Sequence, residues 1–115
     1  MVNRLARAVA RFLTLCPYTL SVHDLITKYR ILLEGGYLFD LYFNETRNTY
    51  SYTLIQGCRR ILGWDNAPHH PDLENYPHHF HRDDGTIVPS ALAGVPEEDI
   101  NLIAATLNKY LAQQL

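Results

Sequence analysis

Histidines are concentrated in one short segment of this 115-residue chain. Five of its six histidines lie between residues 69 and 81, in two groups separated by a proline-containing stretch. An imidazole titrates near neutral pH, so it accepts a proton, donates one or binds a metal ion. A packed core has little use for five such groups, and we therefore expect the chemistry of the protein here. The five are His69, His70, His78, His79 and His81.

Two arginines and several aromatic residues precede this segment and could complete a site for RNA. Cleavage of RNA without a metal needs a base for the 2′-hydroxyl, an acid for the 5′-oxygen and a cation beside the phosphorus. The histidines could supply the base and the acid, and Arg59 or Arg60 the cation. Exposed aromatic rings could stack on unpaired bases. The candidate substrate-binding residues are Tyr50, Tyr52, Trp64 and Asp65.

Metal binding is the first alternative use of the histidines. His79 and His81 are two positions apart, and an aspartate at 65, 72 or 83 could add an oxygen ligand. Such a set would suit zinc or another transition metal. However, adjacent histidines separated by prolines match no standard metal-site spacing, so we expect no metal and no other cofactor.

The second alternative is a structural role, in which histidines and tyrosines bond backbone carbonyls and hold a proline-rich loop across the sheet. Large aromatic residues in a short domain usually pack, which applies to Trp64, Tyr76 and Phe80. Asp65 and Asn66 are expected to order the start of the loop by side-chain to backbone hydrogen bonds.

Charge is distributed unevenly along the chain. Residues 1–60 hold eight Lys/Arg and four Asp/Glu (+4), and residues 61–115 hold two and eight (−6), which sum to the net −2. An acidic partner would meet the N-terminal part first, although the positive excess is too small to demand nucleic acid.

The length favours a single domain over residues 1–115. Cys16 and Cys58 form no disulfide framework and no run approaches the roughly 20 apolar residues of a membrane span, which favours a cytoplasmic protein.

Periodicity predicts the elements. Apolar residues at spacings of three and four predict a first helix that ends before Pro17, with Arg4, Arg7 and Arg11 on its opposite side as a solvated face or a contact to phosphate or an acidic protein. A capping pattern at 21–24 predicts a short helix over 22–28. Alternating aromatic and apolar residues then predict strands over 29–34, 37–44, 49–56 and 58–65, the last with Arg60, Leu62 and Trp64 on one face. A second helix follows Pro96.

Residues 66–90 contain four prolines and show no usable periodicity, so we expect a long loop there. The predicted fold class is α+β. It consists of an N-terminal helix, an antiparallel sheet of about four strands, a long His/Pro-rich loop lying over the sheet, and a C-terminal helix packed on the sheet.

An ordered set of motifs resembles the TumE family of toxins from type II toxin–antitoxin systems. The motifs are YSY at 50–52, WDNAPHHP at 64–71 and YPHHFH at 76–81, and the resembling region runs from about residue 30 to the C-terminal helix. The chain departs from the expected pattern at Thr53, where a histidine is expected, and at Tyr76, where phenylalanine is more usual. The resemblance implies a toxin encoded beside a helix-turn-helix antitoxin and, by analogy with small α+β toxins, a ribonuclease that blocks translation.

We therefore predict a metal-independent ribonuclease toxin that is neutralised by an antitoxin bound to a basic, aromatic surface. The alternative from another class is a zinc-binding or non-catalytic protein-interaction module.

Overall fold

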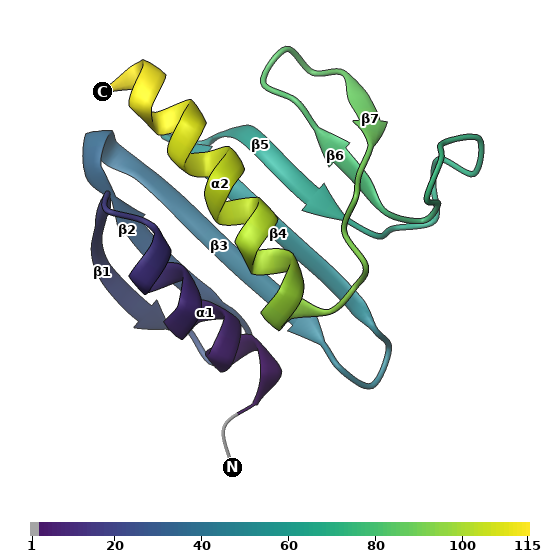
Figure 1. Cartoon of the computed structure of the whole chain (residues 1–115), viewed down its shortest axis with the longest axis horizontal. Helices are drawn as coiled ribbons and strands as arrows, with labels where there is room; N and C mark the ends of the chain where they lie inside the picture. The colour runs from purple at the N-terminus through teal and green to yellow at the C-terminus, as the bar shows by residue number, and fades with distance from the viewer. Residues whose placement is uncertain (1–2) are drawn as a thin grey trace.

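A computed structural model describes residues 3–115, and this part of the chain forms one antiparallel sheet of seven strands with two helices (Figure 1). The strands are hydrogen-bonded in sequence order from β1 to β7. The predicted α+β class is confirmed, but the prediction of about four strands was wrong. The elements are α1 (Arg4–Leu15), β1 (Thr19–Asp24), β2 (Tyr29–Leu33), the short 3-10 turn η1 (Glu34–Gly36), β3 (Tyr37–Asn44), β4 (Thr49–Gln56), β5 (Arg59–Asp65), β6 (His79–His81), β7 (Ile87–Pro89) and α2 (Pro96–Gln114).

Two of the three additional strands lie inside the segment expected to be a loop, and the third replaces the short helix expected over 22–28. Ser21 does not cap a helix, because it lies in β1 and pairs with Leu32 of β2. The strands β6 and β7 have only three residues each, too few for a period of two to be recognised in the sequence. Of the residues in this segment that stay irregular, 66–78 project beyond the end of β5 (Figure 1), although the ring of His70 reaches back to His79 of β6.

Both helices lie side by side on the same face of the sheet (Figure 1). The side chain of Asn3 caps α1 by accepting a hydrogen bond from the Ala6 amide at 2.7 Å, and α1 ends before Pro17, as predicted. Pro96 begins α2, also as predicted, and the Asp99 carboxylate accepts bonds from the three amides before the helix. Phe12 of α1 and Ile103 of α2 are fully buried against the sheet.

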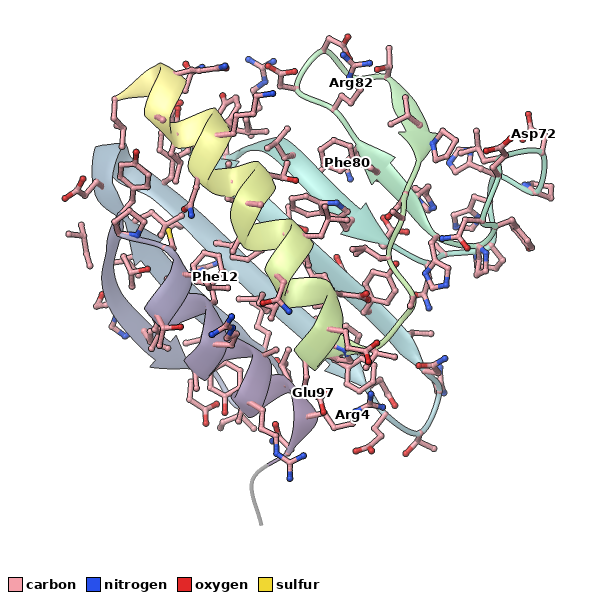
Figure 2. All side chains as sticks on the ribbon, in the orientation of Figure 1. Arg4, Phe12, Asp72, Phe80, Arg82 and Glu97 are labelled. Atoms are coloured by element: carbon pink, nitrogen blue, oxygen red, sulfur yellow. The ribbon has the colours of Figure 1, made fainter. Side chains whose placement is uncertain are left out.

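The arginines of α1 join the two helices to each other. Arg4 Nε lies 3.0 Å from a carboxylate oxygen of Glu97, and these two side chains point toward one another in Figure 2. Arg7 lies 3.9 Å from the other oxygen, and Arg11 bonds Asn101 of α2 at 3.2 Å. The sequence analysis gave two interpretations of this arginine stripe, a solvated face or a contact to phosphate or an acidic protein. In the structure the three arginines instead contact α2.

The opposite face of the sheet carries no helix within the described residues, and we call it the open face. Two rows of cross-strand partners define it. Each strand from β2 to β6 contributes one residue to the first row, and each strand from β3 to β6 contributes one residue to the second row. Residues that are remote in sequence therefore become neighbours on this face. The first row is Arg30, Asp40, Thr53, Gly63 and His81, and the second is Tyr42, Ser51, Asp65 and His79.

A β-bulge in β5 changes the face on which Arg60 lies. Leu54 pairs with Leu62, but Ile55 pairs with Arg60, so Ile61 is an extra residue without its own partner. Strict alternation had predicted Arg60 on the face of Leu62 and Trp64, which was wrong. The extra residue turns Arg60 to the open face, where its side chain lies over Gly63. A Cβ atom on residue 63 would lie only 3.2 Å from Cδ of Arg60, so the glycine leaves room for this side chain.

In the part of the chain that the structure describes, neither helix has the length and apolar character needed to cross a bilayer.

Candidate functional site on the open face

Asp65 and two histidines converge at the edge of the open face. Asp65 ends β5, and its register partner His79 begins β6, with His81 two residue pairs further along, opposite Gly63. Nε2 of His79 lies 3.0 Å from one carboxylate oxygen of Asp65, and Nε2 of His81 lies 3.0 Å from the other. The Asp65 carboxylate also accepts a hydrogen bond from the Ala67 amide at 3.0 Å, which holds it in place. We call Asp65, His79 and His81 the triad.

The acceptors around His79 determine where its protons lie. Nδ1 of His79 is 3.0 Å from the Pro77 carbonyl oxygen, which only accepts hydrogen bonds, so this nitrogen carries a proton. Nε2 faces a carboxylate, which also only accepts. With the His79 side chain 3% exposed, this 3.0 Å contact needs either a hydrogen atom or a metal ion between Nε2 and the Asp65 oxygen.

His81 has the opposite arrangement, with one nitrogen left for chemistry. Its Nε2 donates to Asp65, so the other ring nitrogen, Nδ1, holds the lone pair of the neutral ring. Among the described residues no hydrogen-bond partner is found for this Nδ1, and it is not among the fully buried polar atoms that lack one. Burial lowers the pKa of His81, and the charge of Arg60 lowers it further, against the raising effect of Asp65. The neutral ring with a free Nδ1 is thus favoured near pH 7.

The two arginines predicted to bind phosphate lie on different faces. Arg60 is close enough to His81 for its charge to lower the pKa of that ring. Arg59 instead acts on the pKa of Tyr110, in α2 on the helix-covered side, where it opposes the raising effect of burial. The structure therefore places Arg60 with the triad and Arg59 away from it.

The remaining loop histidines are also divided. The ring of His70 contacts His79 with centroids 4.9 Å apart, and His79 contacts His81 at the same distance. His69 is exposed and only its backbone is engaged, in a turn to Ala67. His78 lies apart from the triad. Its Nδ1 is 2.8 Å from the Tyr50 hydroxyl and its ring stacks on Tyr50, while burial lowers its pKa.

Three aromatic residues predicted to bind substrate are buried beneath the helices. Tyr50, Tyr52 and Trp64 are 3%, 1% and 3% exposed, because they share a face with Leu54 and Leu62 and belong to the core. Burial also raises the pKa of both tyrosines. Trp64 packs on Phe80, as expected for a large aromatic in a short domain. The rings therefore present no free surface on which a base could stack.

Sequence reasoning missed the residues that border the triad on the open face. Tyr42 is partly exposed and lies in the row of Asp65 and His79, with Ser51 between. In the other row, Asp40 forms ion pairs with Lys28 and Arg30. Thr53 and Gly63 lie between Asp40 and His81 in that row. The alternation of Leu38, Asp40 and Tyr42 along β3 was a usable signal, because it places Tyr42 opposite the core.

The expected ordering of the loop start is confirmed. Besides the bond from the Ala67 amide to Asp65, the Asn66 side chain accepts from the Tyr50 amide at 3.0 Å and donates to the Asn48 carbonyl at 2.7 Å. These bonds fix the exit from β5 and hence the position of the Asp65 carboxylate.

The donor set of the triad also matches a metal site. One ligand atom from each of Asp65, His79 and His81 lies within 4.8 Å of the other two. Two imidazole nitrogens with one carboxylate favour a transition metal such as zinc over magnesium or calcium. The triad therefore has two possible uses, proton transfer and metal binding.

A search of curated proteins and a search of solved structures each returned no match to the chain. The family model described as "Toxin TumE" matches residues 3–113, nearly the whole chain. This match confirms the resemblance carried by the motifs at 50–52, 64–71 and 76–81 and extends it to α1 and β1. The chain belongs to the TumE toxin family.

Proposed function

We propose that this toxin is a metal-independent endoribonuclease that blocks translation in the cytoplasm, with its active site around His81 on the open face. The observation that carries the proposal is the hydrogen bond from His81 Nε2 to Asp65, because it leaves Nδ1 of His81 as a positioned base beside the cation Arg60. The membership in a toxin family supplies the biological context.

The reaction we propose is attack of a ribose 2′-oxygen on the adjacent phosphorus. His81 Nδ1 takes the 2′-hydroxyl proton, the bond from the 2′-oxygen to phosphorus forms, and the bond from phosphorus to the 5′-oxygen breaks. We assign the proton donated to the leaving 5′-oxygen to the ring of His70, which is in contact with His79. Arg60 stabilises the charge on the phosphoryl oxygens. The products are a 2′,3′-cyclic phosphate and a 5′-hydroxyl.

Asp65 and His79 are positioning residues in this scheme. Asp65 keeps the His81 ring in the tautomer with a free Nδ1, as a carboxylate does for many general bases. His79 holds the second oxygen of Asp65 and contacts both His70 and His81. Tyr42 supplies a partly exposed ring on the same face for stacking a base.

The test compares neighbouring histidines in purified protein that has been treated with a chelator. His81→Gln and His70→Gln should each lower the rate of RNA cleavage by about a hundredfold or more, with little change in thermal midpoint. His69→Gln is the matched control, since His69 is exposed and only its backbone is engaged, and it should cleave at the parental rate. Equal cleavage by all three variants would remove His81 and His70 from the mechanism.

The toxin family implies an antitoxin partner. We propose that this partner is a helix-turn-helix protein encoded next to the toxin gene, and that it covers the open face around Arg60 and Tyr42. Expression of the toxin alone should arrest the growth of a bacterial host, and co-expression with the neighbouring gene should restore it. Arg60→Glu should weaken the complex, whereas Arg59→Glu, on the other face, should not. Normal growth with abundant folded toxin would favour a non-catalytic interaction module.

A further inference from the structure

We infer that the triad is an inhibitory binding site for a zinc-class divalent metal, which inactivates the toxin by changing the tautomer of His81. The inference deepens the proposed function and rests on it for the inhibitory effect, but the metal site itself rests on geometry alone.

The contact between His79 and Asp65 requires a proton or a metal ion between the two side chains. Its Nδ1 donates to the Pro77 carbonyl, so a neutral His79 ring directs its lone pair from Nε2. That lone pair faces a carboxylate oxygen of Asp65 at 3.0 Å, and the side chain of His79 is 3% exposed. Two electron-rich atoms at this distance repel each other unless a proton or a metal ion lies with them.

The ligand atoms are also at a suitable spacing. A tetrahedral zinc site with bonds of about 2.1 Å places its ligand atoms about 3.4 Å apart. Nε2 of His79 and Nε2 of His81 each lie 3.0 Å from a different carboxylate oxygen of Asp65, and a set of one ligand atom from each residue lies within 4.8 Å of one another. Small side-chain movements would therefore admit the ion, with water in the fourth position.

The outer contacts of the triad are those of a metal-binding site. A ligating histidine commonly donates its second ring N–H to a backbone carbonyl, as His79 does to Pro77. The carboxylate ligand is commonly hydrogen-bonded as well, and Asp65 accepts a bond from the Ala67 amide. Both contacts would persist in the metal-bound protein, so the ion replaces a proton without dismantling the site.

Metal binding reverses the roles of the two nitrogens of His81. Without metal, Nε2 carries the proton and donates to Asp65, which leaves the lone pair on Nδ1. With metal, the lone pair on Nε2 binds the ion, so the ring proton of the neutral ligand must lie on Nδ1. Nδ1 can then no longer accept the 2′-hydroxyl proton, and RNA cleavage stops.

Titration of chelator-treated protein with ZnCl2 in a calorimeter tests the site directly. The expected result is about one zinc per chain, with no heat from MgCl2. Asp65→Asn and His79→Gln should weaken binding by at least tenfold, and the control His69→Gln should not. Because either triad variant could unfold, ¹⁵N NMR of the parental protein gives a second readout: zinc should move the His81 ring proton from Nε2 to Nδ1. No zinc binding, or binding without this change, overturns the inference.

The ribonuclease assay separates the two proposals. Zinc should abolish cleavage of RNA, and excess chelator should restore it. Loss of activity in chelator with recovery in zinc would overturn both the inhibitory role and the metal-independent mechanism. An inactive metal-free protein that still binds one zinc with the His81 tautomer change would refute the ribonuclease and leave the metal site supported.

Discussion

His79 directs both of its ring nitrogens at oxygen atoms, one of which belongs to Asp65 at 3.0 Å and the other to the Pro77 carbonyl. This residue pair joins the beginning of β6 to the end of β5. The same carboxylate holds His81, so a single side chain orders two of the five clustered histidines.

Asp65→Asn should destabilise the fold as well as stop cleavage. The change removes the carboxylate that bonds the buried ring of His79, and loss of one partner from a buried hydrogen bond costs about 1–3 kcal/mol. Urea denaturation would measure it. Asp72→Asn is the control, because Asp72 lies exposed in the projecting loop (Figure 2) and should leave the urea midpoint unchanged. An Asp65→Asn variant of parental stability would mean that the contact between Asp65 and His79 does not stabilise the fold.

The sequence was sufficient to predict the two long helices and the central strands, but not the segment over 22–28, where a helix was expected and β1 lies. The apolar spacing of α1 and the period of two in β3 and β4 extend over enough residues to be recognised. The strand β6 has only three residues, so its period of two cannot be recognised in the sequence. It nevertheless builds the site, because it places His79 and His81 on one face of the sheet and Phe80 on the other.

Two errors in the predicted site have local physical causes. The bulge at Ile61 depends on pairing with β4 and leaves no signal in β5 itself, so strict alternation put Arg60 on the wrong face. Tyr50 and Tyr52 were expected to bind RNA, although they alternate in phase with the buried Leu54. They were proposed as rings for stacking on bases, but packing beneath the helices determined their position.

Arg60 and Arg59 should differ in their effect on RNA binding. Because Arg60 lies beside His81, Arg60→Gln should remove one phosphate contact and lower the slope of log affinity against log salt by about 0.7. Arg59→Gln should leave the slope unchanged, since Arg59 lies near Tyr110 on the other face. Fluorescence anisotropy with a single-stranded RNA at several salt concentrations measures both. A larger effect from Arg59 would place the RNA on the helix-covered side.

Removal of the side-chain hydroxyl should change the free energy of unfolding in opposite directions at two stacked tyrosines, Tyr50 and Tyr52. The Tyr52 hydroxyl is buried and has no hydrogen-bond partner within residues 3–115, so Tyr52→Phe should raise the free energy of unfolding by up to about 1 kcal/mol. Tyr50→Phe should lower it by about 1 kcal/mol, because the bond to His78 is lost. Urea denaturation gives both values. Neither variant should change RNA cleavage, and a loss of activity in stable Tyr52→Phe would restore that ring as a substrate contact.

Asp40 should contribute to stability only when it is ionised. Burial acts to raise its pKa, but hydrogen bonds from Arg30 and Lys28, at 2.8 Å each, outweigh burial and hold the pKa below its usual value. The unfolded group titrates near about 3.9, so the contribution is complete above that pH and is lost as the pH falls through the lower folded value. Asp40→Asn should therefore cost roughly 1–3 kcal/mol at pH 7 and progressively less below pH ~4. Urea denaturation of both proteins from pH 7 to pH 2 measures the difference. A difference that stays constant over this range would mean that the charge of Asp40 does not stabilise the sheet.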